Sequence, residues 1–273
     1  MPSPIPDFVR TDLSALGLTL SEAQVAQLGA YLDLLLAKNE VMNLTAIKDR
    51  DLAWRRLILD SLTIMPQLME PLPNGERPGN LIDIGSGGGM PGIPIAIACP
   101  NLRVTLLDAT GKKVAFHKEV IAALELKNCK SIQGRAELLG RDKANHRAKY
   151  DIAASRAVGP IAQILEYSVP LMRLGGRMLA IKGPRVAEEL DDASDALQLL
   201  DTADLQIIPA WPEEYGNDLV IVSLTKMEPT KNAYPREGGL IKNSPLGTIR
   251  EKDAKKGKSQ NKRKQEEIED LLD

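Results

Sequence analysis

A glycine-rich turn and a downstream acid are the residues of this chain whose types and spacing could bind a ligand. Gly85 follows an apolar segment and begins a turn that holds five glycines within eight residues. A second apolar segment ends at Asp108, 23 residues after Gly85. A glycine turn lets the backbone approach a nucleotide-like ligand closely, and an acid at the next strand end can accept hydrogen bonds from a ribose. The pattern predicts a site for an adenosine-containing cofactor at the carboxyl ends of a parallel sheet.

The identity of that cofactor depends on what surrounds the glycines. Gly87, Gly89 and Gly92 match the spacing of the dinucleotide fingerprint, so a nicotinamide or flavin enzyme is an alternative. Pro91 and Pro94 argue against it, because proline supplies no N–H where a dinucleotide fold turns a helix N-terminus toward a pyrophosphate. S-adenosylmethionine has no pyrophosphate and needs a glycine turn for its methionine part and an acid for its ribose. The sequence therefore favours S-adenosylmethionine.

The composition excludes several other classes of protein. The 273 residues are 43% hydrophobic, enough for one large domain or for a domain with extensions, and only 3% aromatic, which disfavours a base-stacking RNA surface. Two cysteines, Cys99 and Cys129, and two histidines, His117 and His146, show no zinc spacing and no disulfide pattern. No signal-peptide pattern and no membrane-spanning apolar stretch is present. We expect a soluble cytoplasmic protein with no metal and no membrane partner.

The charge of the chain is unevenly distributed. The net charge is −2, yet the segment from Lys226 to Lys264 contains 12 lysines and arginines against four acids. A basic arm on an acidic body favours a polyanionic partner, whereas a solvated tail is the alternative explanation. For residues 251–264 alone, a disordered tail is the better hypothesis.

Apolar periodicity divides the chain into helices followed by a sheet. Ser21 and Gln24 form a capping box at the start of a helix, residues 43–47 break that helix, and a second helical stretch is expected over 51–68. From Leu81 onward strands alternate with helical segments, which is typical of a doubly wound α/β fold. The last two strands are expected to form a hairpin. The seven predicted strands are 81–85, 104–108, 131–133, 150–155, 176–183, 205–208 and 219–224.

These elements suggest four parts of the chain. Residues 1–79 form an N-terminal helical extension packed on the core, and residues 80–227 form a Rossmann-like domain. A basic C-terminal segment follows over residues 228–250, and a charged tail over residues 251–273.

Several short motifs occur together in one order and identify a family. The chain resembles the small-subunit ribosomal RNA methyltransferase G family, also called the glucose-inhibited division protein B family. The resemblance covers roughly residues 13–249. Departures are Leu57 in place of a common histidine, Met90 in place of a common phenylalanine, and Asn217-Asp218 where many members carry a basic pair. The matching segments are 43–47, 58–62, 83–94, 106–108, 134–137, 155–158, 182–183, 234–236 and 245–246.

The resemblance implies a fold, a reaction and a partner. It implies a Rossmann-like class I S-adenosylmethionine-dependent methyltransferase, with a seven-stranded, mostly parallel sheet and N-terminal helices. Such enzymes methylate N7 of a guanine in 16S rRNA, so the partner is the small ribosomal subunit, and a monomer is expected. The alternatives are a non-catalytic methyltransferase-like protein that binds RNA or assembling subunits, and a methyltransferase for small molecules or proteins.

Motif positions and strand ends together give the candidate site residues. Arg156, at the end of the fourth strand, is the catalytic or substrate-holding candidate, with an ordinary surface arginine as the alternative. Asp108 could instead cap the next helix, and Met90 could be a core methionine. The cofactor-binding candidates are Gly85, Met90, Asp108, Ala109, Thr110, Ala136, Glu137 and Arg156. The RNA-binding candidates are Arg135, Lys182 and Arg236.

The small number of cysteines and histidines, and two further acidic residues, are relevant to the expected mechanism. N7 of guanine is a lone-pair nucleophile without a proton, so we expect neither a catalytic histidine nor a cysteine nucleophile. The methylated guanine gains positive charge, and Asp60 or Asp83 could stabilise that charge. Asp60 and Ser61 lie on the helix before the sheet, where a structural role is equally compatible with the sequence.

Overall fold

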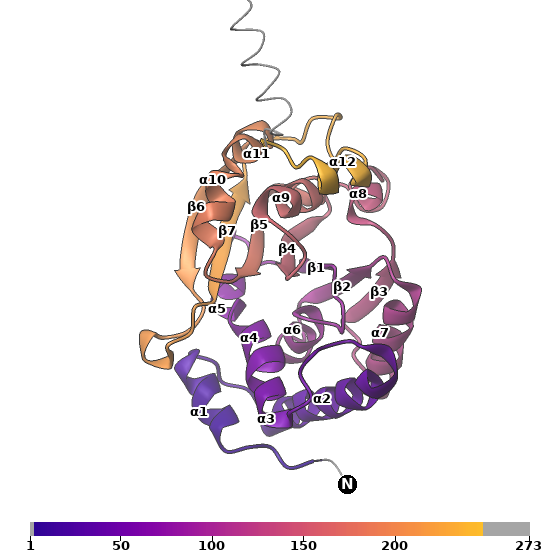
Figure 1. Ribbon diagram of the computed structural model, residues 1–273, viewed down its shortest axis with the longest axis vertical. Helices are drawn as coiled ribbons and strands as arrows, with labels where there is room; N and C mark the ends of the chain where they lie inside the picture. Colours follow the sequence, from indigo (N-terminus) through magenta and orange to yellow (C-terminus); the bar gives the residue numbers. More distant parts are fainter. Residues whose placement is uncertain (1–2, 248–273) are drawn as a thin grey trace, which may run out of the picture.

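The computed structural model describes residues 3–247 of the chain (Figure 1). The helices are α1 (Phe8–Ala15), α2 (Glu22–Met42), α3 (Arg50–Ala53), the π-helix η1 (Trp54–Leu59), α4 (Asp60–Leu62), α5 (Met65–Met69), α6 (Gly92–Ala98), α7 (Gly111–Ala123), α8 (Ala136–Leu139), α9 (Ile161–Ser168), α10 (Val186–Asp191), α11 (Ser194–Leu199), the 3₁₀-helix η2 (Glu213–Tyr215) and α12 (Gly238–Asn243). The strands are β1 (Asn80–Ile84), β2 (Arg103–Asp108), β3 (Cys129–Gln133), β4 (Tyr150–Arg156), β5 (Met172–Lys182), β6 (Thr202–Pro209) and β7 (Val220–Lys226).

The seven strands form one sheet in the order β3-β2-β1-β4-β5-β7-β6. The first five strands are parallel to one another, while β7 runs antiparallel to both β5 and β6. The predicted seven-stranded, mostly parallel sheet with a final hairpin is confirmed, with β7 inserted between β5 and β6. Because parallel strands end at the same edge, the carboxyl ends of β1, β2, β3 and β4 lie together.

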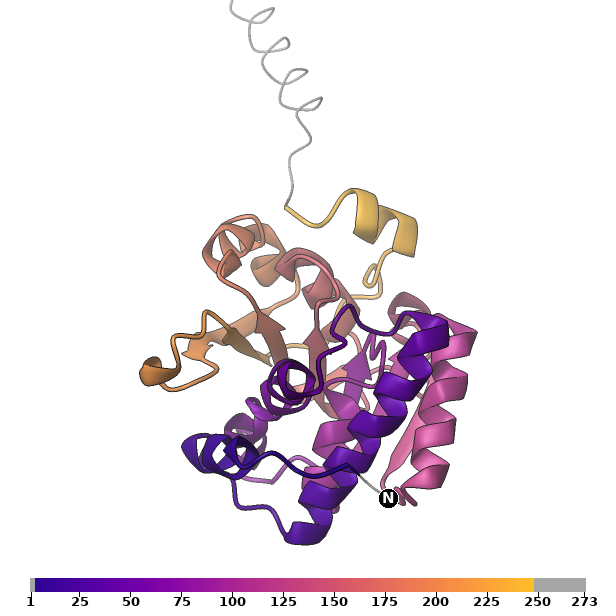
Figure 2. The ribbon, with the colours of Figure 1, turned by 60° about the horizontal axis from the view of Figure 1, so that its bottom comes forward.

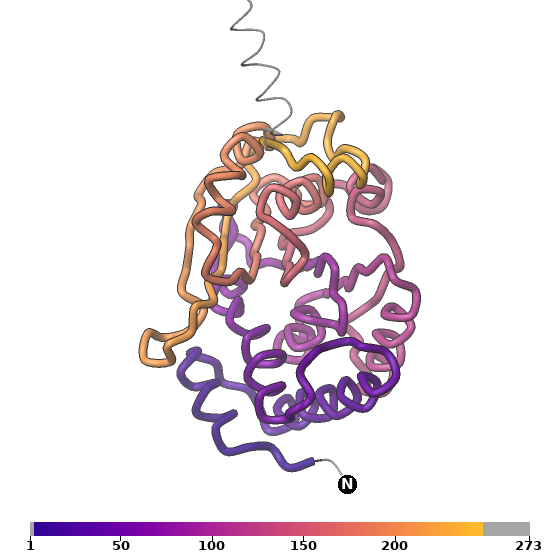
Figure 3. The backbone as a smooth tube through the Cα atoms, in the orientation of Figure 1, coloured from indigo at the N-terminus to yellow at the C-terminus, as the bar shows by residue number. Residues whose placement is uncertain are grey.

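Helices cover the two faces of the sheet with separate hydrophobic cores. Side chains alternate along β1, so Leu81 packs into the core formed with α1–α7, whereas Ile82 packs into the core formed with α8–α11. On the first face α2 and α7 lie side by side (Figure 2). On the second face α12 lies beside α9 (Figure 3). The N-terminal helices thus share a core with the sheet.

The start and end of α2 follow the sequence prediction. The Ser21 side chain accepts the N–H of Gln24, and the Gln24 side chain accepts the N–H of Ser21, which is the predicted capping box. The helix ends at Asn43, whose φ of 48° is left-handed. Asn39 stabilises the exit by accepting the N–H groups of Leu44 and Thr45.

The helical stretch predicted over residues 51–68 is confirmed, with the π-helical segment η1 between α3 and α4 and a turn at residues 63–64 before α5. The chain widens into the π-helix η1 and continues as α4, then turns before α5, which begins with Pro66 near its first position. Proline has no N–H for a continuous helical ladder, which favours a break there. Single-turn π segments occur often at functional sites.

The predicted four-part division of the chain stays a prediction, and the tail at residues 251–273 lies outside the described residues. Within residues 3–247 no helix has the length and apolar composition needed to cross a bilayer. Over the same residues no group of three His, Cys, Asp or Glu side chains is placed to hold a metal ion.

Candidate functional site

The glycine turn after β1 is fixed by bonds to elements on both sides. Gly85 has a φ of 71°, and a Cβ there would lie 2.9 Å from Cγ2 of Val158, so close packing and backbone conformation both require glycine. The hydroxyl of the buried Tyr31 donates to the carbonyl of Gly88 at 2.8 Å. A Cβ on Gly92 would lie 2.2 Å from Leu106, so that glycine serves helix–strand packing. The turn is therefore preorganised before any ligand binds.

Asp83 ties the far end of this turn to β1. Its Oδ2 accepts the Gly92 N–H at 2.9 Å, and its side chain is fully buried. Burial raises the pKa of Asp83 to about 7. Its Oδ1 has no hydrogen-bond partner among the residues that the structure describes. Asp83 therefore lies behind the turn as a support.

Asp108 joins the end of β2 to the glycine turn. Its Oδ2 accepts the Gly87 N–H at 3.0 Å, its Oδ1 accepts the Thr110 N–H at 2.8 Å, and Nζ of Lys113 is 3.9 Å away. Thr110, not Asp108, is the N-cap of α7, so the helix-cap alternative for Asp108 is wrong. Each carboxylate oxygen retains capacity to accept another hydrogen bond.

A cavity of about 140 Å³ lies at the carboxyl ends of β1, β2 and β3. Six of the predicted site residues line this cavity. Val158 and Tyr167 also line it, and the sequence analysis did not identify them as site residues. Neither Met90 nor Thr110 lines this cavity: Met90 is half-buried against the core under the N-terminal helices. The six predicted residues that line the cavity are Gly85, Asp108, Ala109, Arg135, Ala136 and Glu137.

The C-terminal segment approaches Glu137, one of the residues that line the cavity. Glu137 is 6% exposed, and a Cβ on Gly238 would lie 2.0 Å from its Oε1, so a larger residue at the start of α12 would displace the Glu137 carboxylate. Arg135 is the more exposed partner of Glu137, with 3.5 Å between Nη1 and Oε1. Arg135 alone among the three RNA-binding candidates retains a largely exposed side chain.

The histidine nearest the turn has a structural role. His117 is fully buried, with Nε2 at 2.8 Å from the Gly87 carbonyl and Nδ1 at 3.0 Å from the Ser131 hydroxyl. Because a carbonyl only accepts, Nε2 carries the proton and Nδ1 accepts from the serine. Burial lowers the pKa of His117, which keeps the ring neutral. The imidazole supports the glycine turn and is not available as a base.

Arg156 leaves the end of β4 and turns toward the π-helix η1. Its guanidinium donates to the carbonyls of Arg56 and Leu57 and lies 3.5 Å from the Ser61 hydroxyl. Nη2 is also 3.6 Å from Oδ2 of Asp60. The side chain is 20% exposed, and burial lowers its pKa. The ordinary surface arginine suggested as an alternative does not describe this residue.

Asp60 joins Arg156 to a tryptophan from the other end of the sheet. The indole N–H of Trp211, in the β6–β7 connection, donates to Oδ1 of Asp60 at 2.8 Å. Asp60 is 1% exposed, and burial raises its pKa although two arginines, Arg56 and Arg156, oppose that shift. Sequence reasoning missed Trp211, and no spacing rule identifies a partner 151 residues away. We call Asp60, Arg156 and Trp211 the Arg156 cluster.

Two of the RNA-binding candidates are engaged within the protein. Lys182 lies 2.6 Å from Oε2 of Glu189 and donates to the Gly159 carbonyl. Arg236 forms a two-pronged pair with the fully buried Glu166, with Nη2 at 2.8 Å from Oε2. Both cations therefore fasten chain segments to the fold.

In the part of the basic segment that the structure describes, Lys226 and Lys231 also contact the rest of the protein. Lys226 is buried and donates to the carbonyls of Val169 and Met172, and burial lowers its pKa to about 8. Lys231 lies 3.5 Å from Oδ2 of Asp201. The described part of the basic arm therefore contributes to packing, and its more basic continuation lies outside the described residues.

The strand order, the glycine turn after β1 and the acid that ends β2 together define a class I S-adenosylmethionine-dependent methyltransferase. The family model for rRNA small subunit methyltransferase G matches residues 24–213. The relative from Chloroflexus aggregans with that name is 42% identical over 234 residues, covering 85% of this chain and 94% of the relative. The relative from Sorangium cellulosum is 47% identical over 189 residues, covering 69% and 77%.

The chain belongs to the rRNA small subunit methyltransferase G family. This family comprises the S-adenosylmethionine-dependent 16S rRNA guanine-N7 methyltransferases. The predictions of family, fold class, rRNA methyltransferase activity and cofactor are confirmed. The oligomeric state and the site residues stay predictions.

Proposed function

We propose that the cavity beside the glycine turn holds S-adenosylmethionine and that the Arg156 cluster organises the adjoining surface for N7 methylation of a 16S rRNA guanine. The observation that carries this proposal is the convergence of Gly85, Asp108 and Glu137 on one cavity at the carboxyl edge. Val158 also lines the cavity and follows Arg156 by two residues, which links the two parts of the site.

The residues of the cavity fit the parts of this cofactor. When bound, S-adenosylmethionine supplies an electrophilic methyl group. Asp108 accepts one backbone N–H on each oxygen and can still accept the two ribose hydroxyls. Ala109 and Ala136 offer small apolar surfaces for the adenine, and Gly85 lines the same cavity beside Val158, where the methionine part would lie. Met90 and Thr110 keep at most a peripheral role.

The chemistry needs orientation more than proton transfer. Guanine N7 has a lone pair and no proton at neutral pH, so no general base has to act first. Burial raises the pKa of Cys129 to about 12, which keeps that thiol protonated, and His117 is already bonded on both nitrogens. Correct placement of the reacting atoms supplies up to about 7–11 kcal/mol in favourable cases.

Arg156 is the group proposed to hold an anion at this site. Asp60 and the carbonyls of η1 fix the guanidinium, so its positive charge and its Nε–H are preorganised for an anionic oxygen. The anion is either the carboxylate of the cofactor or a phosphate of the RNA. Asp60 and Asp83 are both buried, so they would stabilise the positive charge of the methylated guanine by electrostatic attraction without direct contact.

The test combines product mapping with an Arg156→Lys variant. Purified protein is incubated with S-adenosylmethionine and small subunits that lack the modification, and N7-methylguanine is mapped by borohydride and aniline cleavage. Wild-type protein should give a single new cleavage in 16S rRNA. The Arg156→Lys variant should lower turnover by about tenfold, because an ammonium group lacks the planar guanidinium that the η1 carbonyls and Asp60 hold in one orientation.

Each outcome has a distinct meaning. Loss of cofactor affinity in Arg156→Lys assigns the residue to the carboxylate, whereas a loss confined to the RNA-dependent rate assigns it to a phosphate. Full activity in the variant contradicts the assignment of Arg156. Intact cofactor binding by the wild type without cleavage would favour the non-catalytic alternative.

A further inference from the structure

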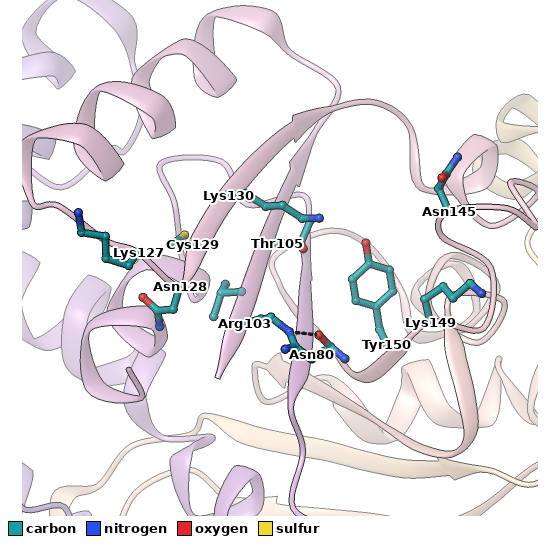
Figure 4. Close-up of a pocket in the computed structure, with 11 residues that line it drawn as sticks. Asn80, Arg103, Thr105, Lys127, Asn128, Cys129, Lys130, Asn145, Lys149 and Tyr150 are labelled. Atoms are coloured by element: carbon teal, nitrogen blue, oxygen red, sulfur yellow. Dashed lines mark hydrogen bonds between the residues drawn. The ribbon is translucent and has the colours of Figure 1, made fainter. Parts of the chain in front are cut away.

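A second cleft lies at the edge of the sheet opposite to the cofactor cavity. Its volume is about 400 Å³, and its lining comes from the amino ends of β1, β2, β3 and β4 and the turns that precede them (Figure 4). Along β2 the distance from Arg103 in this cleft to Asp108 in the cofactor cavity is five residues, or roughly 16 Å. The cleft is therefore separate from the methyl-transfer site.

The floor of the cleft is formed by the first residues of β1, β2 and β3. Register pairs Asn80 with Arg103 and Thr105 with Lys130, and these four side chains share one face because side chains alternate along a strand. The same face becomes apolar toward the carboxyl edge, where Leu107 packs into the second core. Parallel strands normally present apolar side chains on both faces, so the polar residues at this end of the sheet need an explanation.

Four cations line this cleft and none of its eleven lining residues is acidic. Arg103, Lys127, Lys130 and Lys149 are all exposed. Within residues 3–247 none of the four belongs to an ion pair, in contrast to Lys182. Unpaired cations gathered around one cleft, on a chain whose net charge is −2, create a local site for anions.

Two polar contacts orient groups within the cleft. Nε of Arg103 donates to Oδ1 of Asn80 at 2.7 Å, which leaves the terminal N–H groups of the guanidinium for another acceptor. The hydroxyl of Tyr150 lies 2.9 Å from Nδ1 of His146, and Figure 4 shows the Tyr150 and Lys130 side chains on the same side of the strands.

We propose that this cleft binds the phosphodiester backbone of the rRNA substrate as a second contact away from the reacting base. The proposal rests on rRNA being the substrate. A backbone contact fits because phosphates require cations and donors without aromatic stacking, and the cleft offers a single aromatic ring, Tyr150. Such a contact adds affinity and orientation without touching the chemistry at guanine N7.

The test is the double variant Lys130→Gln/Lys149→Gln, with Lys38→Gln/Lys118→Gln as a control of equal charge change on α2 and α7. Binding and methylation of small subunits that lack the modification are measured from about 50 to 200 mM salt. The cleft variant should raise KM and Kd for RNA by about tenfold and flatten the log–log salt slope by about 1.4–1.8. Its kcat at saturation, its affinity for S-adenosylmethionine and its melting temperature should match the wild type.

Wild-type KM and salt slope in the cleft variant would overturn the proposal, as would an equal loss in the control pair, which would indicate a general charge effect. Unchanged RNA binding with lost binding of a mononucleotide would assign the cleft to a small anion instead. The wild type serves in the same assay as a check on rRNA methylation itself. If it modifies no rRNA, the proposed function fails, whereas an active wild type with an unaffected cleft variant refutes only the second contact.

Discussion

The cofactor cavity and the Arg156 cluster lie at the same edge of the sheet but are assembled in different ways. The cavity comes mainly from the turns that follow β1, β2 and β3, and its main anchor, Asp108, bonds backbone N–H groups at positions 87 and 110. The Arg156 cluster unites residues from η1, β4 and the β6–β7 connection through side-chain contacts.

The geometry of the two regions therefore depends on different parts of the chain. The cavity is shaped by backbone, whose geometry is set within a few residues of each glycine. The Arg156 cluster is a buried network of charged and polar side chains, and such networks depend on every member being satisfied. Changes in the cavity should therefore affect cofactor affinity, and changes in the cluster should affect turnover.

The largest expected effect comes from Asp108→Ala. The substitution removes the proposed acceptors for the ribose and the link to the Gly87 N–H, so affinity for S-adenosylmethionine should fall by about 100-fold or more. Isothermal titration calorimetry measures this affinity. Asp108→Asn keeps one acceptor oxygen and should lose less. Wild-type affinity in the Asp108→Ala variant would remove Asp108 from the cofactor site.

A pH effect of intermediate size is expected from Asp83. Its folded-state pKa of about 7 lies above its ordinary value of 3.8, so the folded protein binds the proton more tightly than the unfolded chain. This contribution to stability is complete below about pH 4 and is lost as the pH rises through 7. Between pH 5 and 7 the free energy of unfolding should fall by about 2 kcal/mol on account of Asp83.

The Asp83→Asn variant isolates that contribution. Asparagine can still accept the Gly92 N–H but does not titrate, so the variant should lack this downward slope with pH. Urea unfolding at a series of pH values gives the comparison. Identical slopes in the two proteins would mean that Asp83 does not titrate in this range.

The smallest effect is expected from Trp211→Phe. Phenylalanine removes the N–H that Oδ1 of Asp60 accepts, which loosens the carboxylate that holds Arg156. We expect turnover to fall by about three- to fivefold with cofactor affinity unchanged. Steady-state kinetics on small subunits, together with calorimetry, would measure both quantities.

Trp54→Phe is the matched control for this variant. Trp54 is also buried, yet its indole N–H has no hydrogen-bond partner among the described residues, so the same change in size removes no bond. Trp54→Phe should reduce stability but not turnover. Equal losses of turnover in the two variants would show that packing, and not the bond to Asp60, is responsible.

The sequence determined the parts of this protein whose cause is local. The capping box at Ser21, the glycine turn at Gly85, the acid at Asp108 and the seven strands were all predictable, because each depends on backbone geometry or on periodicity over a few residues. The family motifs then narrowed an adenosine-cofactor fold to an rRNA methyltransferase.

Only the tertiary structure decided which charged side chains are paired. Nothing in the sequence distinguishes Lys182 and Arg236 from Lys130 and Lys149. Packing nevertheless gives the first two carboxylate partners and leaves the other two exposed around a cleft. The π-helical segment η1 and the bond from Trp211 to Asp60 were likewise visible only in the folded structure. Long-range contacts depend on how separate elements dock, and a residue's chemical type does not carry that information.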